Sequence, residues 1–399
     1  MKSIHFYLET LKVRNILILS LATFLYSLTF YTTIFTLFLV ERGLNYVEIF
    51  LLESILSASI VLFEVPSGVL ADRFGRKKVI IASICLFTLS TFIIAFSHSF
   101  LWFVVESVLY GIGIAAMSGA DSAMIYESLQ KKQKKALADY SFSSLSTAAT
   151  MAMVISLPLG GWMAEYSLDL PVYITCMSLT AATAVSFFLK ETYINETKKS
   201  ETKRIIHSLG TIIKKSPFLF LFQAIQSMAS GFVFSLVYLN QPLFLSYDIE
   251  MQAFGWIMLV IHLLSSGVVL MAPMVRRKYG LTFIFSFTFF APGISLFLLS
   301  FQPSMIMGIT LLTLAITIHG VNDPIYRTFL NELVSDQNRA TSLSIINLTG
   351  SIVGMCIKPL IGFFTEIDLY PAFTLMGSIM MTLAILIPFM LKKIKSLQI

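Results

Sequence analysis

The chain has 399 residues, of which 56% are hydrophobic and 13% are charged, and its mean hydropathy is +0.82. A soluble domain carries about 25% charged residues, so this composition excludes a soluble enzyme and indicates a membrane protein. The net charge of +6 does not indicate nucleic-acid binding, because the basic residues lie in the short segments between apolar stretches.

Twelve apolar stretches of about 20 residues each predict transmembrane helices and an all-α membrane protein. A charged segment, residues 190–216, divides six of them from the other six. We therefore expect a six-helix bundle over 1–189, a cytoplasmic linker over 190–216 and a second six-helix bundle over 217–399. In chain order the predicted spans are 15–40, 46–70, 79–97, 100–126, 137–163, 171–189, 217–240, 252–275, 281–300, 304–331, 340–364 and 370–391.

The basic residues predict the orientation. If the N-terminus is cytoplasmic, 25 of the 28 lysines and arginines fall in cytoplasmic segments, while Arg42 is external and Arg327 and Lys358 lie within spans. This is the positive-inside pattern. We expect a multi-pass protein of the plasma (inner) membrane with both termini in the cytoplasm.

The two halves repeat each other. Pro158, Leu159, Gly161 and Glu165 match Pro359, Leu360, Gly362 and Glu366 at a constant separation of 201 residues. Repeats of six helices in the same orientation predict two bundles related by an axis along the membrane normal.

Between the second and third spans lies a basic loop, residues 68–78, here called the signature loop. It resembles the signature of the major facilitator superfamily through Gly68, Asp72, Arg73, Gly75 and the basic run Arg76, Lys77 and Lys78. The resemblance implies two pseudo-symmetric six-helix bundles and a transporter that is not an enzyme and needs no cofactor.

The residues of the signature loop also have a physical rationale. Gly68 and Gly75 allow a tight turn and close approach of helix ends, and Asp72 can face the positive end of a helix. In the family the loop's arginine meets an acid at the inner end of the fourth helix, for which Glu127 and Asp121 are the candidates. We expect a conformational latch formed by Gly68, Asp72, Arg73, Gly75, Arg76 and Glu127.

Ionisable groups within spans are costly and usually face a cavity or a partner. His319, Asp323 and Arg327 follow at intervals of four, which predicts one helical stripe that binds protons. A static network or part of an inner gate is the alternative. Glu106 and Asp121 are the other candidates for proton coupling or substrate attraction, and the alternative for Glu106 is an acid wetted from the outer vestibule. Glu53 is interpreted as interfacial.

The family places the first, fourth, seventh and tenth spans around a central cavity. We expect an adaptable, largely apolar pocket with polar contributions from aromatic and amide side chains. Lys358 replaces a glycine in a sequence similar to the antiporter motif, and the span that normally carries that motif lacks its glycines, which weakens an antiporter assignment. The predicted cavity-lining residues are Tyr26, Tyr31, Gln226, Asn240 and Lys358.

The predicted function is proton-coupled export of small amphipathic or cationic compounds by alternating access. The alternatives are a metabolite importer or facilitator, whose anionic substrate would bind Arg327 or Lys358, and a lipid flippase on the same fold. The expected partners are a small-molecule substrate, protons and the lipid bilayer, with no nucleic acid and no metal. We expect a monomer.

Overall fold

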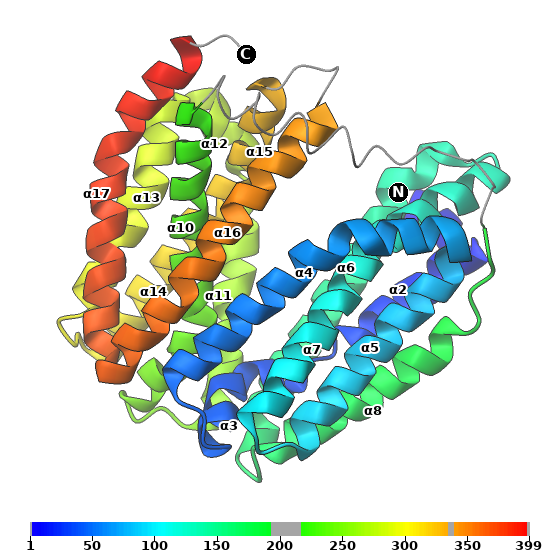
Figure 1. Ribbon diagram of the computed structural model, residues 1–399, viewed down its shortest axis with the longest axis horizontal. Coiled ribbons are helices and arrows are strands. Elements are labelled where there is room, and N and C mark those ends of the chain that lie inside the picture. The colour runs from blue at the N-terminus through cyan, green and yellow to red at the C-terminus, as the bar shows by residue number, and fades with distance from the viewer. Residues whose placement is uncertain (1, 193–216, 334–338, 397–399) are drawn as a thin grey trace. The chain divides into compact units, whose positions relative to one another are not determined.

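The computed structural model describes residues 2–192, 217–333 and 339–396, so most of the predicted linker lies outside the described residues. Every regular element in these residues is helical, which confirms the all-α prediction (Figure 1). The elements are α1 (Lys2–Leu11), α2 (Arg14–Tyr26), η1 (Phe30–Ile34), α3 (Phe35–Glu41), α4 (Tyr46–Phe74), α5 (Arg76–Phe96), α6 (Phe100–Lys131), η2 (Lys135–Leu137), α7 (Ala138–Ala164), α8 (Asp169–Ser186), α10 (Pro217–Leu245), α11 (Met251–Val269), α12 (Ala272–Lys278), α13 (Leu281–Leu299), α14 (Met305–Gly320), α15 (Asn322–Leu333), α16 (Arg339–Ile367) and α17 (Leu369–Ser396).

Eleven segments of the described chain are helical, long and apolar enough to cross a membrane. The remaining predicted span, 171–189, corresponds to α8, which has 18 residues and contains Asp169 together with several threonines and serines that lower its hydropathy. The chain is therefore a multi-pass membrane protein.

The chain divides into two compact units. The first contains Met1–Leu44, Ile55–Thr197 and Ile249–Leu259, and the second contains Asn45–Ser54, Lys198–Asp248 and Val260–Ile399. The start of α4 therefore belongs to the second unit and the start of α11 to the first. The bundle boundaries predicted from the sequence stay a prediction.

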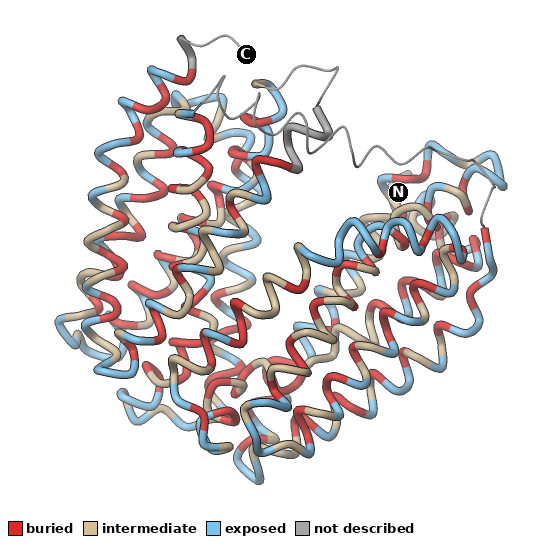
Figure 2. Tube along the Cα trace, viewed as in Figure 1, coloured by how far each residue is buried: buried red, intermediate tan, exposed pale blue. Residues whose placement is uncertain are grey.

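The core of the first unit lies among α2, α5, α6, α7 and α8. Ile16, Ile80, Ile84, Met124 and Leu129 are fully buried there, whereas the outward sides of the same helices are exposed (Figure 2). Many exposed side chains are also large and apolar, such as Leu89 and Phe92. Close packing, rather than removal of apolar surface from water, must therefore hold these helices together in lipid.

The N-terminal helix α1 is tied to the first unit by charge. The Lys134 ammonium donates a hydrogen bond of 2.7 Å to the Glu9 carboxylate. Hydrogen bonds from Lys12 and Lys134 lower the pKa of Glu9 from 4.5 to about 2. A lowered pKa means that this attachment is complete above pH 4.5 and is lost as the pH falls toward 2.

The first predicted span is interrupted. Helix α2 ends at Tyr26, and the chain continues as η1 and α3. Hydroxyl groups take part in the hydrogen bonding of the break: the Phe30 N–H donates to Thr175 Oγ1 at 3.0 Å, and Thr33 Oγ1 donates to the Leu157 carbonyl at 3.0 Å. Non-helical backbone at membrane depth requires such partners within the protein.

Gly160 on α7 makes this break possible, because a Cβ at that position would collide with the carbonyl oxygen of Phe30. We expect Gly160→Ala to lower the free energy of unfolding by about 1 to 3 kcal/mol, since backbone must move to admit the methyl group. Thermal unfolding in detergent measures the effect. The control is Gly119→Ala on α6, where a Cβ meets no atom within 4 Å. Equal melting temperatures for the two variants would contradict the close contact.

Prolines divide two predicted spans of the second unit. Pro273 follows the end of α11 and lies in the first turn of α12. Pro324 lies in the first turn of α15, directly after α14 has ended at Gly320. Proline lacks the N–H that would continue the ladder of the preceding helix. Each proline therefore begins a new helix.

Phenylalanine rings fill the core of the second unit beside the α10 helix. The Phe222 ring lies 5.4 Å from that of Phe285 and 6.0 Å from that of Phe329, both in edge-to-face geometry. Such pairs stabilise packing beyond the area that they bury. They fix α10, α13 and α15 relative to one another.

Candidate functional site

The signature loop turns at Gly75, whose φ of +94° favours glycine. The Glu191 carboxylate, from the segment after α8, accepts hydrogen bonds from the backbone N–H groups of Arg76 (3.1 Å) and Lys77 (3.2 Å). An anion at this helix start is favourable because the first N–H groups of α5 have no partner within the helix. A Cβ at Gly75 would collide with that carboxylate. Glycine therefore provides both the backbone angle and the space for Glu191.

Gly75→Ala should lower the free energy of unfolding by about 1 to 3 kcal/mol, the usual cost of forcing a side chain into this backbone region. Gly68→Ala is the matched control, because a Cβ at Gly68 meets no atom within 4 Å. The close approach expected at Gly68 stays a prediction. Denaturant titration of both variants tests the difference, and an equally stable Gly75→Ala protein would exclude this role for Gly75.

Charged side chains connect the signature loop to α6. The Arg76 guanidinium contacts Asp72 at 2.7 Å and Glu127 at 3.2 Å, and the Thr192 hydroxyl donates to the other Glu127 oxygen at 2.7 Å. Of the two acids expected to meet the loop's arginine, Glu127 does so. All four residues belong to the first unit. Their role as a conformational latch stays a prediction.

Arg73, by contrast, is exposed on the signature loop. Its guanidinium lies 5.4 Å from the centre of the Phe74 ring. A cation over an exposed ring contributes about 0.5 to 1 kcal/mol. The structure therefore distinguishes Arg76, which joins helices, from Arg73, which contacts its neighbour in sequence.

Two acids of α6 occupy different surroundings in the first unit. Glu106 is buried, and its carboxylate accepts a hydrogen bond of 3.1 Å from the Ser107 hydroxyl. Asp121 is partly exposed and accepts from the Ser122 hydroxyl at 3.0 Å and from the Ser122 N–H. They lie about 22 Å apart along the helix axis. Glu106 is therefore less accessible to solvent than Asp121.

The two tyrosines predicted to line a cavity belong to the same unit. Tyr31 is buried and contacts the Phe35 ring at 5.2 Å. Tyr26 is partly buried, with its ring 5.9 Å from that of Phe87. Both rings thus contribute to packing.

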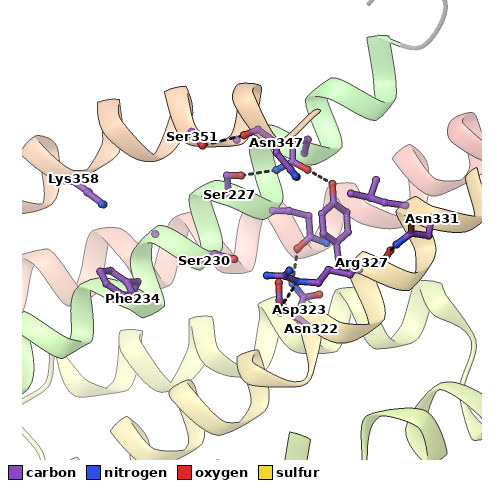
Figure 3. Close-up of a pocket in the computed structure, with 16 residues that line it drawn as sticks. Ser227, Ser230, Phe234, Asn322, Asp323, Arg327, Asn331, Asn347, Ser351 and Lys358 are labelled. Atoms are coloured by element: carbon purple, nitrogen blue, oxygen red, sulfur yellow. Dashed lines mark hydrogen bonds and ion pairs between the residues drawn. The ribbon is translucent and has the colours of Figure 1, made fainter. Parts of the chain in front are cut away.

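A pocket of about 680 Å³ lies in the second unit, bordered by α10, α15 and α16 (Figure 3). Its charged lining residues are Lys358 on α16 and the pair Asp323 and Arg327 on α15. Lys358 lies at one end of the pocket, away from Arg327 (Figure 3). Phe234, Tyr326 and Leu330 also line the pocket, and the predicted apolar character of the central cavity stays a prediction. The amide and serine residues of the wall are Gln223, Gln226, Asn322, Asn331, Asn347, Ser227, Ser230 and Ser351.

Hydrogen bonds lead from this pocket to a buried histidine. Asn322 Nδ2 donates to Gln226 Oε1, and Thr288 Oγ1 donates to Asn322 Oδ1 at 3.3 Å. His319 Nδ1 lies 3.2 Å from the Thr288 carbonyl, and its Nε2 lies 3.2 Å from the Ser230 hydroxyl. Because a carbonyl only accepts, Nδ1 carries the proton, and a neutral His319 accepts from Ser230 at Nε2.

Of the predicted stripe, His319 lies at the end of α14, and Asp323 and Arg327 lie on α15, with Val321 between the two helices. The role of the three residues in proton binding stays a prediction. The His319 side chain is buried, whereas those of Asp323 and Arg327 are 64% and 75% exposed. Asp323 and Arg327 do pair, at 2.8 Å. The break at Val321 lies between a buried histidine and an exposed ion pair.

The second unit also holds an ion pair near the pocket. The Lys358 ammonium lies 3.4 Å from Glu53 Oε2 and donates to the Glu53 main-chain carbonyl at 3.2 Å. The Tyr238 hydroxyl donates to Glu53 Oε1. The side chains of Lys358 and Glu53 are 12% and 11% exposed. Glu53, which was expected at the membrane interface, is therefore a buried partner of Lys358.

Among the predicted cavity-lining residues of this unit, Gln226 and Lys358 line the pocket, and Asn240 is buried on α10 outside its wall. The sequence did not predict that Glu53 and Tyr238 contact each other beside Lys358. The signal that points to them is the requirement that a lysine within an apolar span find an anion.

Comparisons with known proteins give the family. The quinolone resistance protein NorA of Staphylococcus aureus is 24% identical over 214 residues, which cover 53% of this chain and 53% of NorA. An uncharacterised transporter of Buchnera aphidicola is 26% identical over 165 residues, 41% of each chain. The chain thus matches about half the length, or less, of these curated relatives.

Solved structures show the same fold. The nucleoside transporter NupG has a TM-score of 0.81 at 15% identity, covering 94% of this chain and 100% of that one. The D-xylose-proton symporter has a TM-score of 0.70 at 14% identity, covering 96% and 97%. The Major Facilitator Superfamily model matches residues 19–359. The chain belongs to the Major Facilitator Superfamily.

Proposed function

We propose that this transporter exports small amphipathic or cationic compounds in exchange for protons, by alternating access of its two bundles. The observation that carries the proposal is the buried Glu106 carboxylate on a membrane-spanning helix. A carboxylate in such surroundings can bind and release a proton or a cationic solute, because a charge is costly within a membrane span. The similarity to NorA supports export as the direction.

The other groups have supporting roles in this proposal. Asp121 and Asp323 are more exposed and serve as further proton sites or attract cations. The Asp72, Arg76 and Glu127 contacts break and re-form as the cytoplasmic side opens and closes. We place the protein in the plasma (inner) membrane as a monomer with cytoplasmic termini, as the distribution of basic residues favours.

Transport into everted membrane vesicles tests the function. We expect the fluorescent cation ethidium to accumulate when the vesicle interior is acidic, and the accumulation to collapse when nigericin removes the pH gradient. Vesicles without the protein are the control. Accumulation of ethidium above its external concentration that persists after the gradient is removed would exclude proton coupling, and no movement of ethidium would exclude cationic export.

Metabolite import or facilitated diffusion is the second candidate. The pocket of the second unit favours it, because its wall is rich in amides and hydroxyls and carries Arg327 and Lys358. Such a wall binds polar solutes by hydrogen bonds. Uptake assays with polar and anionic metabolites, in cells with and without the protein, distinguish the two candidates.

A further inference from the structure

We infer that the pocket of the second unit binds the carboxylate or phosphate group of a small solute, with Lys358 as its cation and Glu53 as an internal competitor for that cation. The inference rests on the second candidate function above, metabolite import or facilitated diffusion, and names the chemical class of its substrates. The proton exchange proposed for Glu106 does not depend on Glu53 or on competition between Glu53 and a solute for Lys358.

The charges of the pocket wall favour an anion. Two cations, Arg327 and Lys358, line the pocket with one acid, Asp323. Arg327 is already paired with Asp323 and is 75% exposed, so solvent weakens its attraction for a further anion. Lys358 is only 12% exposed. An anion at Lys358 therefore experiences the stronger field.

The contact between Lys358 and Glu53 is suited to exchange. Its 3.4 Å separation is longer than the 2.7–2.9 Å that is usual for a charge-assisted hydrogen bond. Glu53 also accepts from the Tyr238 hydroxyl through its other carboxylate oxygen. When a solute anion draws Lys358 into the pocket, Tyr238 still stabilises the Glu53 carboxylate.

A second hydrogen-bond donor of the pocket wall has no acceptor among the described residues. Gln226 is 2% exposed and lines the pocket, and its Nε2 group has no hydrogen-bond acceptor among the described residues. Its carbonyl oxygen is already bound by Asn322, which fixes the amide orientation. A buried donor without a partner is costly. The Nε2 atom is itself buried in this structure, so it donates to a solute oxygen only when the Gln226 amide turns toward the pocket.

Thermal unfolding of the purified protein in a neutral detergent tests the inference with matched probes: benzoate and benzamide, nicotinate and nicotinamide, uridine monophosphate and uridine. We expect at least one anionic member to raise the melting temperature by about 2 to 4 °C and its neutral partner to have no effect. No shift with any anion, or equal shifts within every pair, overturns the inference.

Substitutions locate the binding. Glu53→Gln removes the competitor and should lower the apparent Kd of the active anion by about tenfold. The exchange of both residues, Glu53→Lys with Lys358→Glu, keeps an ion pair for folding but removes the cation from the pocket wall, so the anion should no longer bind. Lys392→Gln, an exposed lysine of α17, is the matched control. Retained anion binding in the exchanged variant overturns the assignment to Lys358.

Two further outcomes are informative. Phosphatidylglycerol added to the same detergent tests whether a lipid headgroup is the source of the anion, and a shift with this lipid but with no soluble anion overturns the solute assignment. Anion binding without ethidium transport supports this inference while contradicting the proposed export, so the two failures are distinguishable.

Discussion

Lys358→Met should lower the free energy of unfolding by about 3 to 5 kcal/mol, the cost of leaving a buried charge without its partner. Methionine keeps the length of the side chain and removes its charge. Glu53 would then retain the Tyr238 hydrogen bond but lose the cation that balances its carboxylate. Chemical denaturation in mixed micelles measures the change.

A double-mutant cycle separates this effect from ordinary loss of packing. Glu53→Gln combined with Lys358→Met removes both charges, so the double variant should recover most of the stability lost in the single variant. Gln retains an acceptor for Tyr238. If the two substitutions destabilise the protein additively, Glu53 and Lys358 do not form the ion pair that the structure shows.

The sequence predicts the helices well because the requirement for a transmembrane span is local. Twenty apolar residues must form a helix in lipid, whatever lies around them. The break after Tyr26 could not be predicted in this way, since its backbone is satisfied by Leu157 and Thr175, which are remote in the sequence. The break before Pro324 did have a local signal, because proline ends the ladder of the preceding helix.

The candidate site shows the same division between local and remote information. The sequence identifies Lys358 as a cation that needs a partner, but 305 residues separate it from Glu53. Only the fold brings the two together. The contact of Arg76 with Glu127 was expected from the resemblance to the family, whereas Glu191, which accepts from the start of α5, carries no sequence signal of that role.

The sequence predicted amides beside a cavity, Gln226 among them, but not how the amides and the large rings divide between the pocket and the core. Phenylalanine and methionine are abundant in the chain, which favoured an apolar pocket. In the structure the large rings of the second unit pack among the helices, as Phe222 and Phe285 do, while the amides of Gln223 and Asn347 line the pocket. Amino-acid composition does not predict which side of a helix faces a cavity.

Glu106→Gln should abolish proton-driven accumulation. A difference of one pH unit is equivalent to about 1.4 kcal/mol per proton, so exchange of one proton for one monovalent cation supports an accumulation ratio of about ten. Glutamine has nearly the same shape and can still contact Ser107, but it neither binds nor releases a proton. The accumulation ratio of ethidium in everted vesicles should therefore fall from about ten to about one.

The variant is informative only if the protein remains folded and mobile. Glu165→Gln, at an exposed carboxylate beyond the end of α7, is the matched control and should leave the accumulation ratio unchanged. Downhill equilibration of ethidium should persist in Glu106→Gln, because alternating access does not itself consume the gradient. If Glu106→Gln still accumulates ethidium about tenfold under the same gradient, the coupling proton is carried elsewhere, and Asp121 and Asp323 become the next carboxylates to replace.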